Sequence, residues 1–228
     1  MTNKAWVDLQ SSDFRNMLIS LIGYRFGDKP EERLDEIRVE RSLYAEGFLK
    51  LADVGPGDTV LDLGSGCGFG TAAIARRARE VIACDISPAF LEYAKQECAS
   101  FDNVRFLQVN SRDLSAVDDQ SVNVVVSMSV FIHLNLYDIY LYFKEFRRIL
   151  RPGGKVVFDF ADMNRLFNRL RAYGNNDLFL EHAEYYRGDP TSIPGLVQWN
   201  SARGISGVAR KAGFKRLKRR GHRLLFGL

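Results

Sequence analysis

The sequence has few cysteines and prolines and lacks a long apolar stretch. Its three cysteines, Cys67, Cys84 and Cys98, are odd in number and never occur with CxxC spacing. A disulfide framework or a thiolate zinc site is therefore not expected, and a reducing compartment such as the cytoplasm fits best. No apolar run reaches the roughly 18 residues of a membrane-spanning helix, and the first residues show no apolar signal core.

Acidic residues are missing from the last part of the chain. Lys and Arg number 32 and Asp and Glu 28, so the formal net charge of the 228 residues is +4. Residues 203–228 contain nine basic residues and no acidic one, which leaves a net charge of −5 on the rest. The positive charge is thus a local property, and it does not by itself indicate a nucleic-acid partner.

Short apolar runs alternate with helical patterns along most of the chain. Strands are predicted at 59–64, 81–85, 104–109, 122–127 and 155–160, and helices at 31–52, 71–80, from Ser87-Pro88 onward, at 136–150 and at 201–212. Apolar runs without polar alternation, separated by helices, are typical of a parallel sheet covered on both faces. Residues 215–220 and 223–228 flank Gly221-His222 and are predicted to pair as an antiparallel hairpin.

The segment 60–71, VLDLGSGCGFGT, carries the strongest functional signal. Its glycines are Gly64, Gly66, Gly68 and Gly70. Between a strand and a helix, glycines permit positive φ and let a ligand approach the backbone closely. The dinucleotide pattern G-x-G-x-x-G fails from Gly64 and from Gly66, and a relaxed match from Gly68 begins five residues beyond Leu63. A nucleotide-cofactor oxidoreductase is therefore the weaker alternative.

The pattern that fits is D-x-G-x-G-x-G, formed by Asp62, Gly64, Gly66 and Gly68. On these residues the chain resembles the class I S-adenosylmethionine-dependent methyltransferases, of the kind that act on small molecules. Asp85 at the end of the second strand, SVNVVVSMSVFIHL, RRILRPGGKVVFDF and the later ARKAGF resemble further elements of that family in the same order. The resemblance covers residues 58–161 well and 198–228 moderately.

The resemblance implies an α/β fold: a Rossmann-like, doubly wound, seven-stranded and mostly parallel sheet with an antiparallel C-terminal hairpin, plus N-terminal helices. It divides the chain into an N-terminal helical cover (1–54), the cofactor-binding core (55–161), an insertion that forms a lid over the acceptor pocket (162–200), and a C-terminal helix and hairpin that complete the core (201–228).

The resemblance also implies a cofactor site for S-adenosylmethionine, with S-adenosylhomocysteine as its product. The residues so implied are Asp62, Gly64, Ser65, Gly66, Asp85, Ile86, Asn110, Ser111, Arg112, Ser127 and Met128. Asp62 and the glycine backbone would face the methionine part, Asp85 the ribose and Asn110 the adenine, where the family usually has an acidic residue. Purely structural roles stay open: Asp62 as a turn cap, Asp85 as an N-cap and Asn110 as a turn residue.

Methyl transfer from a sulfonium needs alignment and a dry pocket, and needs a general base only if the acceptor must lose a proton. His133, after the fourth strand, is the leading candidate base. A His-Leu pair at this position is also common in the family as a purely structural feature. Asp162 is expected at the same mouth. Residues that could shape the acceptor pocket or a lid are His182, Glu184, Tyr185, Tyr186, Tyr24 and Arg25.

Three acceptor chemistries lack the residues they need. Amine methylation of bases or of glutamine typically uses a Pro-Pro-aromatic loop, and here the six prolines are never adjacent. Base C5 methylation needs a cysteine nucleophile, and the three cysteines lie in the cofactor half. Catechol-type methylation needs a metal held by carboxylates, but Ser127 stands at one of these positions, so no metal is expected. O- or N-methylation of a small metabolite is predicted.

The basic segment 203–228 leaves one alternative open. It could contact phosphates or an anionic membrane, so an RNA- or membrane-associated protein is the second reading. Lys and Arg on an edge hairpin also prevent unwanted strand pairing, and this commoner explanation is favoured. We therefore expect a small-molecule acceptor, no transmembrane segment, and a basic hairpin distant from the ligand-binding strand ends. The sequence does not indicate an oligomeric state.

Overall fold

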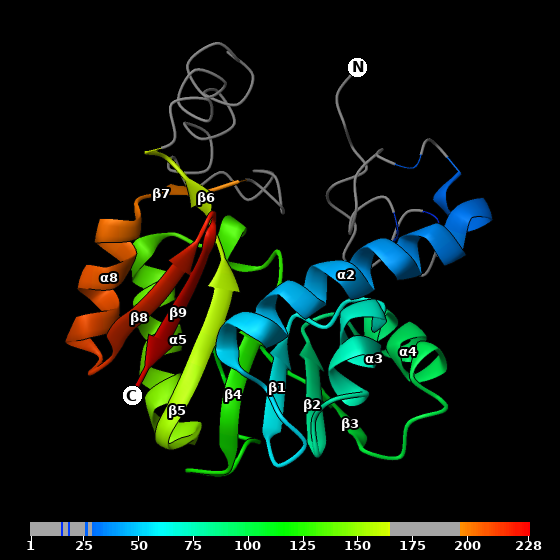
Figure 1. The fold of residues 1–228 in the computed structure, drawn as a ribbon, viewed down its shortest axis with the longest axis horizontal. Coiled ribbons are helices and arrows are strands. Elements are labelled where there is room, and N and C mark those ends of the chain that lie inside the picture. Colours follow the sequence, from blue (N-terminus) through cyan, green and yellow to red (C-terminus); the bar gives the residue numbers. More distant parts are fainter. Residues whose placement is uncertain (1–14, 16–17, 19–25, 27–28, 165–196) are drawn as a thin grey trace.

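The centre of the computed structural model is a seven-stranded sheet with strand order β3-β2-β1-β4-β5-β9-β8 (Figure 1). The structure describes residues 15, 18, 26, 29–164 and 197–228. The strands are β1 (Thr59–Leu63), β2 (Glu80–Asp85), β3 (Val104–Gln108), β4 (Val122–Ser127), β5 (Leu150–Asp159), β8 (Lys215–Arg220) and β9 (Arg223–Gly227). Strands β1 to β5 pair in parallel, whereas β9 is antiparallel to both β5 and β8. The predicted fold class, with its antiparallel C-terminal hairpin, is confirmed.

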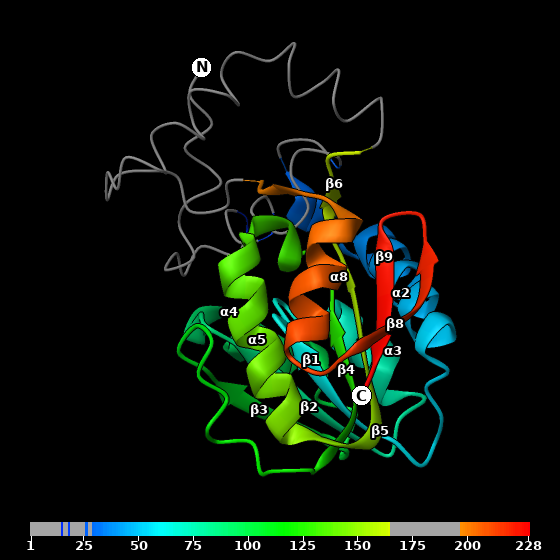
Figure 2. The same ribbon diagram turned by 90° about the vertical axis from the view of Figure 1, so that its left-hand side faces the viewer.

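Helices cover both faces of this sheet (Figures 1 and 2). They are η3 (Pro30–Arg33), α2 (Leu34–Ala52), α3 (Phe69–Ala75), α4 (Pro88–Glu97), η4 (Phe131–His133), α5 (Leu136–Ile149) and α8 (Ala202–Lys211). Helices α2 and α3 pack on one face, and α5 and α8 on the other. Among the described residues, no helix is long and apolar enough to cross a bilayer.

Side-chain caps set where several helices begin. Ser87 Oγ accepts a hydrogen bond from Phe90 N at the start of α4, and Ser201 Oγ accepts one from Gly204 N at the start of α8. Asn135 Oδ1 accepts from two backbone N–H groups at the start of α5. Such caps satisfy N–H groups that have no partner within the helix.

Two predicted elements differ from the observed ones in extent. The helix predicted at 71–80 is α3, which begins earlier, at Phe69, and ends at Ala75. The strand predicted at 155–160 begins at Leu150, because the backbone turns extended directly after α5 and Leu150 pairs with Val122.

Side chains of β1 alternate between the two faces of the sheet, as in any strand. Val60 packs among residues of α2 and α3, whereas Leu61 and Leu63 pack in the cluster that includes α5 and α8. Asp62 therefore points to the α2–α3 face, although it is as buried as its apolar neighbours, with 0% of its surface exposed. Each fully buried apolar side chain contributes about 1.5–3 kcal/mol, so this register is firmly specified.

The C-terminal hairpin reaches the edge of the sheet where the parallel strands end. Because β9 runs antiparallel to β5, its first residue, Arg223, lies opposite Asp159, the last residue of β5. The hairpin turn is thus at the carboxyl edge (Figure 1), and Phe160 N donates to His222 O there. The expectation that the basic hairpin lies away from the ligand-binding strand ends was wrong.

A short two-stranded sheet, β6 (Ala161–Asp162) with β7 (Trp199–Asn200), stands above β5. Its second strand is tied to the segment after β4, because Gln198 N donates to Ile132 O and Asn200 Nδ2 donates to Leu134 O. The described part of the predicted insertion 162–200 is therefore attached to the turn that carries His133.

Candidate functional site

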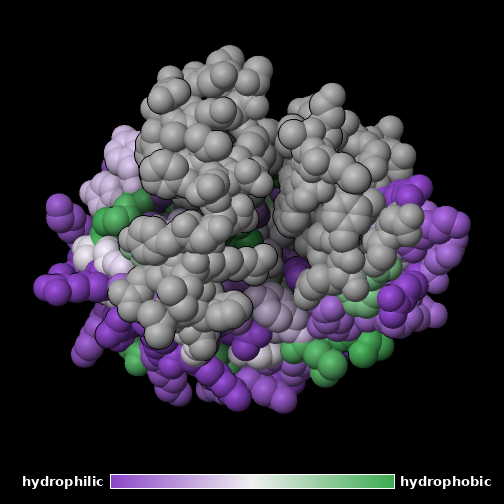
Figure 3. Space-filling view, turned by 90° about the horizontal axis from the view of Figure 1, so that it is seen from above, coloured by the Kyte–Doolittle hydropathy of each residue, from purple (hydrophilic) through white to green (hydrophobic). Residues whose placement is uncertain are grey.

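The carboxyl ends of the parallel strands bring most of the predicted site residues to one edge of the sheet. Ligands of open α/β sheets bind outside this edge. Figure 3 views it from above and shows mainly hydrophilic side chains along its described rim.

The glycine loop after β1 is folded back onto β2. Gly64 N and Ser65 N both donate to Cys84 O, at 2.8 and 3.0 Å. Gly64 has a φ of 77°, and a Cβ there would lie 2.2 Å from Val130 Cγ2, so a side chain would be strained and would collide with the turn after β4. Gly68, with a φ of 86°, lets α3 approach the Ala94 backbone of α4. The glycines thus serve both an open loop and helix packing.

Asp62 lies beneath this loop with one carboxyl oxygen paired. Thr71 Oγ1 of α3 donates to Asp62 Oδ2 at 2.6 Å. Asp62 Oδ1 is buried without a hydrogen-bond partner, and so is Ser65 Oγ. Complete burial raises the pKa of Asp62 from its ordinary 3.8 to about 6, with the Thr71 hydrogen bond acting in the opposite direction. A buried acceptor without a donor is costly unless a ligand supplies one.

Asp85 ends β2 and binds backbone on both sides. Its Oδ2 accepts from Gly66 N at 2.9 Å and its Oδ1 from Ser87 N at 3.0 Å, while burial raises its pKa. These bonds hold the glycine loop and the residue before α4, whose N-cap is Ser87 and not Asp85. Each oxygen has a second lone pair that can still accept from a ligand. The next residue, Ile86, is an apolar side chain with 47% of its surface exposed.

The predicted adenine segment follows β3 and is held by α5. Asn110 and Ser111 are exposed, and Ser111 has a φ of 52°. Tyr142 Oη donates to Ser111 O at 3.0 Å, and Arg112 forms an ion pair with Asp138. Asp138 lies in the first turn of α5, whose N-cap is Asn135.

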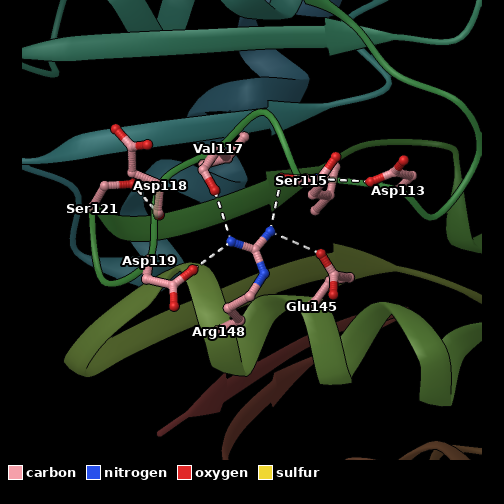
Figure 4. Close-up of polar contacts among 9 residues, drawn as sticks. Asp113, Ser115, Val117, Asp118, Asp119, Ser121, Glu145 and Arg148 are labelled. Atoms are coloured by element: carbon pink, nitrogen blue, oxygen red, sulfur yellow. Dashed lines mark hydrogen bonds and ion pairs between the residues drawn. The ribbon is translucent and has the colours of Figure 1, made fainter.

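Further along the same segment, Arg148 of α5 binds the chain between β3 and β4 (Figure 4). Its guanidinium donates to Leu114 O and Val117 O, each at 2.8 Å, and also to Asp119 and Glu145. Helix α5 therefore fixes the whole segment 110–119 against the sheet.

Two predicted site residues lie at the end of β4: Ser127, its last residue, has a structural role, and the next residue, Met128, lines a pocket. Ser127 is fully buried, and its Oγ donates to Leu63 O at 2.9 Å, which links β4 to β1. Met128 lines a small pocket at the glycine loop. The residues around this pocket are Arg41, Gly64, Ser65, Phe69, Gly70 and Met128. Sequence reasoning missed Arg41 and Phe69, because nothing in the pattern of α2 shows which residues face the loop.

His133 and Asp162 lie on neighbouring segments, because β7 pairs with β6 and is hydrogen-bonded to the turn that carries His133. His133 ends the short helix η4 and is half-buried. Asp162 is fully buried, forms an ion pair with Arg219 and accepts from Asn164 N, so it does not stand open at the mouth as expected. The other predicted acceptor or lid residues lie outside the described residues: Tyr24, Arg25, His182, Glu184, Tyr185 and Tyr186.

A second polar group at this edge was not anticipated. Asp159, at the end of β5, accepts from Ser129 N at 2.7 Å and from Tyr44 Oη at 2.5 Å. His222 Nε2 lies 3.2 Å from the same Tyr44 hydroxyl. This group fastens α2, β5 and the hairpin turn together, and only the tertiary fold reveals it, because its members are far apart in sequence.

The cysteines do not act as thiolates at this edge. Burial raises the pKa of Cys67, Cys84 and Cys98 well above the ordinary value of 9.0, so all three remain protonated. The ranges that the structure describes also contain no cluster of three or more His, Cys, Asp or Glu arranged to hold a metal.

Comparison with known proteins agrees with this architecture. The model of a family described as "Methyltransferase domain" matches residues 60–154. The demethylmenaquinone methyltransferase of Tropheryma whipplei is 34% identical over 108 residues, 47% of this chain and 44% of that protein. The arsenite methyltransferase of Halobacterium salinarum is 39% identical over 112 residues, 46% of this chain and 28% of that protein. The chain therefore spans less than half the length of these relatives.

Solved structures share the fold. The YcgJ protein of Bacillus subtilis has a TM-score of 0.59 at 21% identity. The match covers 76% of this chain and 68% of the YcgJ chain. A geranyl diphosphate methyltransferase in complex with S-adenosylmethionine has a TM-score of 0.58 at 21% identity, with coverages of 78% and 66%. Residues 60–154 thus match a methyltransferase-domain family, and the glycine loop and the strand order have the fold of the class I methyltransferases.

Proposed function

We propose that this protein transfers a methyl group from S-adenosylmethionine to an O or N atom of a small metabolite. The observation that carries the proposal is two buried polar atoms without partners: Asp62 Oδ1 on the strand before the glycine loop, and Ser65 Oγ on a residue that lines the pocket. The ammonium group of an amino acid would donate to Asp62 Oδ1, and another polar group of the same amino acid would bond to Ser65 Oγ. The site therefore fits the methionine part of the cofactor.

The other predicted residues are proposed for the rest of the cofactor. Asp85 would accept from the ribose hydroxyls with its remaining lone pairs. The exposed Ile86 side chain would cover one face of the adenine, and the segment that begins with Asn110, Ser111 and Arg112 would meet its edge. Ser127 would act by fixing the end of β4, since its hydroxyl is bonded to Leu63 O.

When bound, the cofactor supplies an activated methyl group whose bond to sulfur breaks as the acceptor attacks from the opposite side. The protein then needs chiefly to align the acceptor and to exclude water. Met128, beside the pocket, is proposed to line the path to the methyl group. His133 is proposed as the base for an acceptor that must lose a proton.

The names of the relatives support a small-molecule acceptor. They include a demethylmenaquinone methyltransferase and an arsenite methyltransferase. One solved neighbour is titled a geranyl diphosphate C-methyltransferase, so carbon acceptors belong in the test as well.

Calorimetric titration tests the cofactor assignment. We expect the full chain to bind S-adenosylhomocysteine and S-adenosylmethionine but not NADH. Incubation with methyl-labelled cofactor and pooled metabolites should then yield a labelled product. Binding of neither sulfur compound would refute the proposal, and label in RNA alone would refute the small-metabolite acceptor.

His133→Ala tests the proposed base. At saturating cofactor and acceptor we expect kcat to fall by about 10²–10⁴-fold if His133 takes the proton. Raising the pH should partly restore the rate, because the acceptor then ionises on its own. An unchanged kcat would show that alignment alone supports the reaction, with His133 part of the architecture.

A further inference from the structure

The helix α2 contributes a buried cation to the edge of the cofactor pocket. Arg41 lies in the middle of this helix, and only 7% of its surface is exposed. It lines the pocket together with Gly64 and Ser65 of the glycine loop. Arginine is seldom buried this deeply unless it meets charged or aromatic groups.

The packing of α2 determines where Arg41 is presented. The Arg41 guanidinium carbon lies 5.2 Å from the centroid of the Tyr44 ring, and that of Arg223 lies 4.8 Å from the same centroid. The Tyr44 hydroxyl donates to Asp159 at the end of β5. The residue one helical turn after Arg41 is thus fastened to the sheet and the hairpin, which holds Arg41 at the carboxyl edge.

The charges around the pocket are matched to a zwitterion. Asp62 and Asp85 are buried carboxyls; burial is the main cause of the raised pKa of Asp62, and the positive charge of Arg41 makes a smaller, opposite contribution. An ammonium group suits the unpartnered Asp62 Oδ1. A carboxylate attached to the same carbon would be repelled by the two aspartates, unless a cation stood beside it.

We propose that Arg41 binds the α-carboxylate of the amino-acid part of the cofactor and thereby selects cofactors that carry this group. The inference rests on the proposed function, because it assigns one end of the same ligand. A guanidinium suits this task, since its planar N–H groups can form two parallel hydrogen bonds to one carboxylate. It makes α2 a part of the binding site as well as its cover.

The test compares two ligands on the full chain by calorimetry: S-adenosylhomocysteine and its decarboxylated analogue, S-adenosyl-3-thiopropylamine. The wild-type protein should prefer the carboxylate-bearing ligand. Arg41→Met should weaken S-adenosylhomocysteine binding by about 10- to 100-fold, the range of a charge-assisted contact, and change the affinity for the analogue less than about twofold. Arg41→Lys should recover part of the loss.

Arg38→Met is the matched control. It removes one positive charge from the same helix, but Arg38 pairs with Asp35 and Glu97 on the exposed side. It should leave both affinities unchanged. An equal loss of both ligands in Arg41→Met, or no loss, would overturn the inference, and so would equal binding of the two ligands by the wild type. Failure of the wild type to bind either ligand would instead refute the proposed function.

Discussion

At the scale of single residues, Asp62 shows how the site sets binding against stability. Its carboxyl is completely buried, with one oxygen paired and one without a partner. The raised pKa, about 6, means that the folded protein holds the proton more tightly than the unfolded chain. Stability therefore falls as the pH rises from about 3.8 through about 6, and the cost is fully present at neutral pH.

We expect Asp62→Asn to stabilise the ligand-free protein at pH 7.5 by about 1–3 kcal/mol, because the charge is removed while an oxygen remains for Thr71. The gain should shrink on acidification and disappear near pH 4. Urea unfolding across this range measures it, with the exposed Asp102→Asn as the control. A gain that does not depend on pH would contradict the ionisation argument. The same variant should bind S-adenosylhomocysteine more weakly.

Asp85 combines a structural and a proposed binding role, and two variants separate them. Asp85→Ala should weaken S-adenosylhomocysteine binding by about 1–3 kcal/mol, because the ribose and Gly66 N both lose an acceptor. Ser87→Ala removes the side-chain cap of α4 and should cost about 1 kcal/mol of stability with little change in affinity. Titration and thermal unfolding of both proteins provide the comparison. An unchanged affinity in Asp85→Ala would refute the ribose assignment.

At the scale of elements, α5 acts as a support for the segment after β3. Its contacts come from Asp138, Tyr142, Glu145 and Arg148, which recur at helical spacing and so share one face. Two of the acceptors that they satisfy are backbone carbonyls of the buried residues Leu114 and Val117. The proposed adenine segment is therefore preorganised by α5 as well as by its own turn, in which Asp113 N donates to Asn110 O.

Arg148→Met should destabilise the protein by about 1–3 kcal/mol, since it keeps the apolar stem but removes the Arg148 hydrogen bonds to Val117 O and Leu114 O, of which Leu114 O still accepts from Val117 N. We expect a smaller loss of S-adenosylhomocysteine affinity, because Tyr142 and Asp138 still hold Ser111 and Arg112. Denaturant unfolding and titration measure the two effects. Lys144→Met, an exposed position on the same helix, is the control and should change neither. A stability equal to that of the wild type would show that water replaces the lost donors.

Predictability differed between elements for a physical reason. Strands and helix starts depend on local patterns, so the run VLDL and the dipeptide Ser87-Pro88 were sufficient to predict β1 and the start of α4. The place of the basic hairpin depends on pairing between β5 and β9, which are separated by more than sixty residues. No local signal reports which edge a turn will occupy, and for this reason the location of Gly221-His222 was predicted wrongly.

At the scale of the whole molecule, the basic charge lies along an edge strand whose turn reaches the site. All six residues of β8 are exposed, whereas β9 beside it is largely buried. Arg219 is committed to Asp162, so the basic residues of β8 do not form a uniform surface. Lys215, Lys218 and Arg220 are the members that best serve to keep other strands from pairing with this edge.

Replacing Lys215, Lys218 and Arg220 together by Ala should leave S-adenosylhomocysteine affinity unchanged and increase self-association, because an uncharged edge is open to strand pairing. Analytical ultracentrifugation over a range of concentrations measures this. Single-stranded RNA should bind the wild type weakly. Tight RNA binding that falls steeply with salt, and that this triple variant abolishes, would instead favour the RNA-associated alternative.

The sequence by itself determined the alternation of strands and helices, the glycine loop and the aspartates at the ends of β1 and β2, because these features are set within a few residues of one another. Tertiary structure alone decided that Arg41 faces the pocket, that Asp162 is paired with Arg219, and that Tyr44, Asp159 and His222 meet at one edge. These contacts join distant parts of the chain. They exist only once the burial of apolar side chains has fixed how helices and strands lie against each other.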